Sequence, residues 1–206
     1  VQTSSGLPVI ESYLDEQALD SPSLALANAT RETLNMADGV KLMLQYFWTG
    51  YSTRDLNLTL RVQNEDDRVD AYNRQIKDYL SRINEGLSGE EARWQFALLT
   101  YANELESVGD IIDKNLCDTL RKQTSEAVYL PEPDYQALCE LYERVMMRFD
   151  VALGLLASRG EGQVEEFLSG KESLNEWCRE VQKAHYERLH AANAGTLAAS
   201  TYFLDL

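Results

Sequence analysis

The chain has 206 residues, of which 44% are hydrophobic and 26% charged, and these shares are ordinary for a globular protein. Its net charge of -15, with no Lys/Arg clusters, argues against a nucleic-acid-binding surface, because phosphate neutralisation needs clustered cations. No apolar run reaches the roughly 20 residues that span a bilayer. The chain begins with Val and carries no signal peptide, so we expect a piece of a longer protein, although a removed leader or tag would look the same.

The N-terminal part predicts a lead-in followed by a long helix. Gly6, Pro8 and Pro22 punctuate residues 1–22, which we expect to be extended and to wrap onto the domain. A helix is predicted over residues 23–48, ended by Gly50 and the polar stretch through Arg54. Its apolar face consists of Leu26, Leu34, Met36, Val40, Met43, Leu44 and Phe47.

The next stretch predicts two further helices. Periodicity leaves residues 57–64 ambiguous between strand and helix, and we favour helix because no breaker occurs before Ile83. Ser88 then resembles a helix N-cap, with acidic residues in the first turn and a helix running to about Lys122. The buried stripe of the earlier helix is predicted at Val69, Tyr72, Ile76, Tyr79, Leu80 and Ile83.

The second half repeats this plan after a linker at residues 123–133, which contains two prolines. Helices are predicted at about 135–158 and 164–189, and a last one from about Ala191. We therefore predict an all-α fold of two tandem antiparallel three-helix bundles, residues 23–122 and 134–206. The repeat spacing of roughly 105 residues predicts that the last helix is truncated, leaving an apolar face on which a homodimer could form.

Acidic side chains fall into register on two of the predicted helices. Glu106 and Asp110 are four residues apart, as are Asp66 and Asp70, so each pair shares a helix face. The apolar seam beside the first pair is predicted at Leu105, Val108, Ile111, Ile112 and Leu116. Such a stripe is either a solvated surface or a site for a hard cation, and the spacing alone leaves both open.

Two segments carry a resemblance to a known family. The sequence ELESVGDIID, residues 104–113, resembles the signature of PhoU domains, which are paired three-helix bundles. The segment YLDEQALDSPSLALANATRETLNM, residues 13–36, is similar to the start of the PhoU-like cytoplasmic region of bacterial sodium/phosphate cotransporters. Together with the repeat, the resemblance covers the chain from about Tyr13 to its end.

The resemblance implies a metal site, because PhoU proteins hold multinuclear metal clusters on acidic motifs of this kind. The matching residues are Asp66, Asp70, Glu106 and Asp110. The implied metal is iron or zinc, and oxygen ligands also suit manganese or magnesium. The sequence departs from the family pattern at Ser107 and at Lys114, where the usual Asn comes one residue late, as Asn115. The second-half counterparts are Lys171 and Asn175, so the implied site is confined to the first half.

Little in the sequence favours catalysis. His185 and His190 are five residues apart and do not share a face as an i,i+4 metal pair would, so we expect surface or helix-end histidines. No Ser-His-Asp order and no Gly-rich phosphate loop are present. Trp94, Trp177, Met36, Met146 and Met147 are expected in the core or in interfaces, and the cysteines (Cys117, Cys139 and Cys178) as buried thiols.

The resemblance therefore favours a non-catalytic regulatory domain of a sodium-dependent phosphate transporter. We expect it at the cytoplasmic face of the inner membrane, against a transmembrane domain of the same polypeptide, with contacts through exposed apolar side chains such as Trp48 or Tyr51. Two alternatives stay open: a free-standing PhoU-like regulator of phosphate uptake, and a metal-dependent enzyme that uses the acidic stripes.

Overall fold

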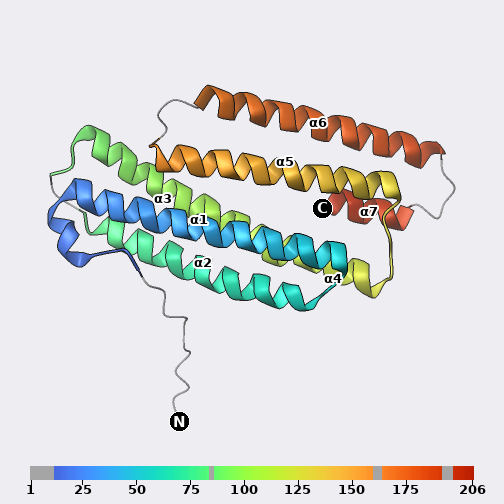
Figure 1. The fold of residues 1–206 in the computed structure, drawn as a ribbon, viewed down its shortest axis with the longest axis horizontal. Coiled ribbons are helices and arrows are strands. Elements are labelled where there is room, and N and C mark those ends of the chain that lie inside the picture. Colours follow the sequence, from blue (N-terminus) through green and yellow to red (C-terminus); the bar gives the residue numbers. More distant parts are fainter. Residues whose placement is uncertain (1–11, 84–85, 160–163, 192–196) are drawn as a thin grey trace, which may run out of the picture.

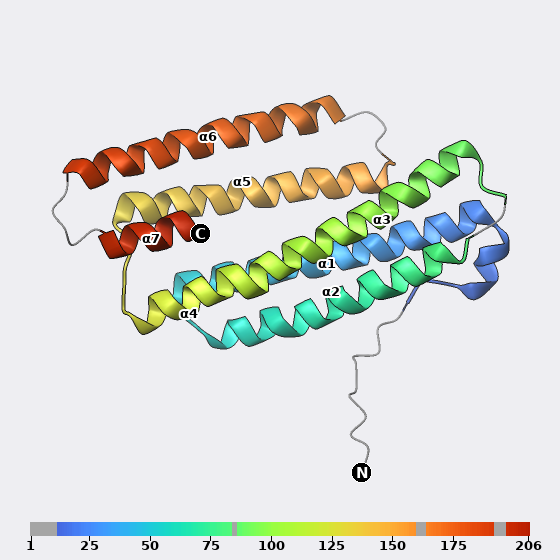
Figure 2. The ribbon, with the colours of Figure 1, turned by 180° about the vertical axis from the view of Figure 1, so that it is seen from behind.

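The computed structural model describes residues 12–83, 86–159, 164–191 and 197–206. Within these ranges all regular structure is helical, which confirms the predicted all-α class. Long helices lie side by side across the molecule, as Figures 1 and 2 show from opposite sides. None of the described helices is long and apolar enough to cross a membrane.

The first part of the chain forms a three-helix bundle. Its members are α1 (Pro22–Thr53), α2 (Asn57–Ser81) and a third long helix made of α3 (Gly89–Asp110), the π-helical segment η2 (Ile111–Leu116) and α4 (Cys117–Ser125). In Figure 2, α3 and α4 follow one line. The ambiguous segment 57–64 is helical, as we favoured.

Periodicity identifies the buried faces of this bundle well. All six residues of the stripe predicted on α2 and just after it are at most 6% exposed. Leu26, Met36, Val40, Met43 and Phe47 on α1 are buried too. The α3 seam is only partly correct, because Val108 is 38% and Ile111 52% exposed while Ile112 is buried.

The first helix ends within the polar stretch that the sequence predicts, but later than the predicted Trp48. It continues through Gly50 to Thr53, and Arg54 then adopts a left-handed conformation with φ 58°. Gly50 is buried, and a Cβ there would lie 3.2 Å from the Asp55 carbonyl oxygen and 3.3 Å from the Leu58 Cβ. This glycine therefore permits a close approach of the chain that follows, and it does not end the helix.

Capping fixes the start of α3. The Ser88 hydroxyl accepts a hydrogen bond from the Glu91 backbone N–H, and the Glu91 carboxylate accepts one from the Ser88 N–H. This reciprocal pair satisfies two backbone donors that a helix start leaves unpaired. The N-cap expected at Ser88 is thus confirmed.

The second part of the chain contains α5 (Glu132–Ala157), α6 (Val164–Ala191) and the short α7 (Leu197–Asp205). Helices α5 and α6 pack against each other, and α5 also packs on α1 (Figure 1). Helix α7 contacts α4 and α6, so it joins the two parts of the chain. Of the residues between the last two helices, 192–196 lie outside the described part, and the predicted start at Ala191 falls within α6.

The described end of the lead-in lies against the first bundle. The Ser12 hydroxyl donates to the buried Glu32 carboxylate at 2.9 Å, and the Tyr79 hydroxyl donates to the Asp15 carbonyl at 2.8 Å. A 3-10 helix, η1 (Glu16–Asp20), interrupts the extended chain that we expected, and it buries Ala18. These contacts anchor the lead-in to α1 and α2.

Candidate functional site

The predicted acidic residues lie where α2 faces α3 and η2. Asp66 is 9% exposed, and its Oδ1 is buried without a hydrogen-bond partner. That oxygen lies 3.2 Å from the position that a Cβ on Gly109 would occupy, so the absence of a side chain at Gly109 leaves room for the carboxylate. Burial, together with the negative charges of nearby carboxylates, raises the pKa of Asp66 to about 6.

The neighbours that act on Asp66 define an acidic cluster of Asp66, Asp70, Asp110 and Asp113. Repulsion from Asp113, Asp70 and Asp110, in that order, adds to the effect of burial on the Asp66 pKa. Burial also raises the pKa of Asp113, the last residue of the ELESVGDIID segment. The cluster therefore combines two partly or wholly buried carboxyl groups with two that are more exposed.

Helix η2 gives this region an unexpected geometry. Its backbone forms a π-helix, in which hydrogen bonds run from i to i+5 and each turn holds an extra residue. Positions four and five after Asp110 therefore both return near it, and these are Lys114 and Asn115. The one-residue delay of Asn115 relative to the family pattern coincides with this widened turn. Periodicity could not have predicted it, because the apolar pattern continues through the segment.

Three of the four predicted metal ligands have partners within the chain. Asp110 forms an ion pair with Lys114, and Asp70 lies 3.8 Å from Arg74. Glu106 accepts a hydrogen bond from the Asn73 side chain, and its Oε2 lies 3.7 Å from the Lys77 ammonium.

These residues do not converge as metal ligands would. In the part of the chain that the structure describes, no three His, Cys, Asp or Glu side chains are placed to hold a metal ion. The unpaired Asp66 oxygen suits a metal ion. The other three carboxylates do not, because an amide, lysines or an arginine of the chain already contact them. The implied metal site at Asp66, Asp70, Glu106 and Asp110 stays a prediction, and its residues do not fit a metal as they are arranged here.

A second polar cluster, which the sequence did not suggest, joins the three helices of the second part. His185 on α6 is 2% exposed, so the expected surface position is wrong for it, whereas His190 is exposed. The Nε2 of His185 lies 2.7 Å from the Ser200 hydroxyl of α7, and the Nδ1 of His185 lies 3.1 Å from the Asp134 carboxylate at the start of α5. Arg188 donates to the same carboxylate.

The Asp134–His185–Ser200 arrangement has the residue types of a hydrolase triad, but the hydrogen bond between carboxylate and imidazole that a triad needs is missing, because His185 Nδ1 has no hydrogen-bond partner. The surroundings do not suit catalysis. All three side chains are at most 7% exposed, which bars a substrate from the Ser200 hydroxyl. The cluster is therefore better explained as a link between helices.

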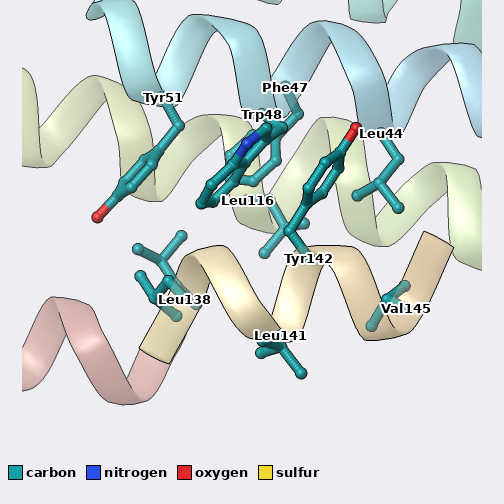
Figure 3. A pocket seen from close by; sticks show the side chains of 10 residues that line it. Leu44, Phe47, Trp48, Tyr51, Leu116, Leu138, Leu141, Tyr142 and Val145 are labelled. Atoms are coloured by element: carbon teal, nitrogen blue, oxygen red, sulfur yellow. The ribbon is translucent and has the colours of Figure 1, made fainter. Parts of the chain in front are cut away.

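An apolar cavity of about 150 Å³ lies between α1, η2 and α5 (Figure 3). The rings of Trp48 and Tyr142 stack beside it, with centroids 4.7 Å apart. Tyr51 is only 7% exposed, and burial raises its pKa to about 12. Trp48 and Tyr51 therefore pack between the two parts of the chain, and the expectation that they are exposed contact residues is wrong.

The remaining candidates divide between core and surface. Met36 is fully buried, Trp94, Trp177 and Met146 are half-buried, and Met147 is 61% exposed, contrary to expectation. Cys117 is buried as expected, but Cys139 and Cys178 are only half-buried. Met147 lies beside α6, where it lines an open hollow with Gly170 and Leu174.

Comparison with known proteins identifies the first bundle. Residues 33–119 match the model of the PhoU domain family, and they run from within α1 to within α4. The chain contains a PhoU domain. Both helices that carry the predicted acidic residues belong to the matched segment, and so do Lys114 and η2.

The similarity to known proteins extends beyond the segment that matches the PhoU domain. The chain is 27% identical over 195 residues to the "Putative inorganic phosphate export protein YjbB" of Salmonella typhimurium, and 27% identical over 199 residues to the protein of that name in Escherichia coli K12. Each alignment covers 94% of this chain but 36% of the relative. The chain thus spans about a third of the length of these relatives. No solved structure matches it significantly.

Proposed function

We infer that this chain is a non-catalytic regulatory domain of a sodium-dependent phosphate transporter. The observation that carries the inference is the extent of the similarity to YjbB, which covers 94% of this chain and so reaches well beyond the PhoU match at residues 33–119. A region related over nearly its whole length to one part of a phosphate export protein fits an accessory domain of a transporter.

The setting that we propose is the one that the family resemblance implies. The transporter partner is a transmembrane domain of the same polypeptide, and the PhoU region lies at the cytoplasmic face of the inner membrane. The relatives are named for phosphate export, so the direction of transport regulated here is a question for measurement. A free-standing regulator is the alternative, and the full sequence of the encoded polypeptide distinguishes the two, because several hydrophobic spans on it identify a transporter.

Transport by the full-length protein, with and without residues 12–206, tests this function. We expect phosphate flux to persist after deletion but to lose its response to phosphate supply, with both directions followed by labelled phosphate. The amount of protein in the membrane, measured by immunoblot, controls for misfolding. Flux and response that match those of the intact protein would exclude a regulatory role.

A hydrolase is a candidate distinct from the metal-dependent enzyme that the sequence left open, and it has its own test. The Asp134–His185–Ser200 arrangement is the specific observation in its favour, and ester hydrolysis by the purified chain is the reaction that it would support. We expect no turnover above that of a Ser200→Ala variant. Turnover that is lost in this variant would replace the regulatory proposal with a hydrolase.

A further inference from the structure

The acidic cluster already contains a cation of the protein. Lys114 forms an ion pair with Asp110 one turn before it, and its side chain is 62% exposed. The hydrogen bond with Asp110 raises the pKa of the Lys114 ammonium, and the charges of Asp66 and Asp70 contribute further. The ammonium therefore lies at the exposed edge of the cluster and acts on several of its carboxylates.

The buried end of the cluster has no such partner. Asp66 is only 9% exposed. Its Oδ1 lies beside Gly109 of α3 and has no hydrogen-bond partner. Lys114 is among the charges that act on Asp66, and it is the one that favours the ionised form. An unpaired buried carboxylate oxygen next to three other carboxylates is a strong attractor for a cation.

We propose that the Lys114 ammonium is the resident counter-ion of the Asp66–Asp70–Asp110–Asp113 cluster and that it excludes divalent metal from it. The ammonium occupies an Asp110 oxygen that a metal would need, and it adds a positive charge beside the position that the metal would take. A divalent ion must therefore displace the Lys114 ammonium from Asp110, and the two positive charges repel each other at close range.

Metal titration of the intact chain tests the proposal with Mn²⁺ as the probe. Calorimetry and the electron paramagnetic resonance of free Mn²⁺ report binding directly, and elemental analysis of protein soaked in iron or manganese salts gives an independent measure. We expect the unaltered chain to bind Mn²⁺ weakly and Lys114→Gln to bind at least about tenfold more tightly. Because Lys114 is exposed, the variant keeps its fold, and a thermal melt verifies this.

Three further variants separate this effect from a general change in charge. Lys183→Gln removes the lysine of another i,i+4 pair, with Glu187 on α6, and should leave Mn²⁺ binding unchanged. Lys114→Arg keeps the positive charge and should bind as weakly as the unaltered chain. Adding Asp110→Asn to Lys114→Gln should abolish the gain, because it removes a ligand.

The proposal is overturned if the unaltered chain binds Mn²⁺ as tightly as Lys114→Gln, or if neither binds it. It is also overturned if Lys114→Arg gains as much affinity as Lys114→Gln, or if Lys183→Gln gains the same. These are binding measurements on the chain alone, so they stand apart from the transport test of the regulatory function. A chain that excludes metal can still regulate transport, and a chain that binds metal can fail to.

Discussion

Ionisation of Asp66 links the acidic cluster to the stability of the fold. An unfolded chain gives this carboxyl its ordinary pKa of 3.8, whereas the fold raises it to about 6. The native state therefore holds the proton more tightly, and stability falls as the pH rises from about 4 through 6. A shift of about two pH units corresponds to an upper limit of about 3 kcal/mol.

Asp66→Asn removes this charge and tests the linkage. We expect the variant to be more stable than the unaltered chain by about 1–3 kcal/mol at pH 7, with little difference at pH 4. Urea unfolding at several pH values, in the presence of a chelator, measures the difference. Asp67→Asn removes a charge from an exposed neighbour and should show no comparable trend. A constant Asp66→Asn effect from pH 4 to pH 7 would contradict the assigned pKa.

The cysteines should differ in reactivity according to burial. Burial raises the pKa of the Cys117 thiol to about 12, and only the thiolate is a nucleophile. Native protein at pH 8 should therefore be alkylated slowly at Cys117 and faster at half-buried Cys139 and Cys178. Mass spectrometry after iodoacetamide treatment measures the three rates, and equal rates in urea provide the control. Equal rates in the native protein would show that Cys117 is accessible.

At the scale of helices, two glycines on α1 and α5 have opposite roles. Gly50 closely approaches a backbone oxygen, whereas nothing lies within 4 Å of a Cβ added at Gly154. Gly154→Ala should therefore stabilise the chain by about 0.5–1 kcal/mol through helix propensity. Gly50→Ala should destabilise it by about 1–3 kcal/mol, because the Asp55 carbonyl must move. Chemical denaturation measures both, and a stabilising Gly50→Ala would refute the close approach.

The buried polar cluster should hold α7 in place. His185→Ala removes the partner of the Ser200 hydroxyl and leaves Asp134 with Arg188, at a cost of about 1–3 kcal/mol. We expect faster hydrogen exchange over Leu197–Asp205 in this variant, measured by mass spectrometry. His190→Ala changes an exposed residue of the same helix and should leave this exchange unchanged. Unaltered exchange in His185→Ala would show that α7 docks without the cluster.

The sequence predicts helices and their apolar faces better than it predicts which residues of other helices pack against them. The stripe from Val69 to Ile83 is correct because period alone determines which face of α2 is apolar. The position of His185 depends on partners from α5 and α7 that are 51 and 15 residues away, which no local pattern encodes. The π-helical turn of η2 likewise arises from backbone spacing, while its apolar residues keep a helical pattern.

The candidate site was predicted in part for the same reason. Helical register correctly places Asp66 and Asp70 on α2, and Glu106 and Asp110 at the end of α3. Register does not reveal that Asp66 is buried against Gly109, because this depends on the packing of α2 against the third helix. The ion pair of Lys114 with Asp110 is an i,i+4 contact within the third helix, and register allows it. Sequence reasoning did note Lys114 as a departure from the family pattern, and this was the available signal.

At the scale of the whole molecule, the core is unevenly distributed. Most of the fully buried apolar side chains come from η1, α1, α2 and the third long helix, and few come from α5 to α7. The two parts meet along α1 and α5, where Trp48 stacks on Tyr142 beside an apolar cavity. The first bundle should therefore contribute more of the stability, because stabilisation follows the apolar area removed from water.

This imbalance predicts two levels of protection in the intact chain. Native-state hydrogen exchange should show the slowest amides in the buried middle of α1 and α2, at the free energy of global unfolding. Amides of α6 and α7 should exchange through partial opening, at least about tenfold faster, because fewer buried contacts resist their separation. Trp48→Ala should accelerate exchange in α5 without changing α2, since it removes the ring stack that joins the two parts. Uniform protection across α1 to α7, or a loss of protection in α2 in the Trp48 variant, would show instead that the chain unfolds as a single cooperative unit.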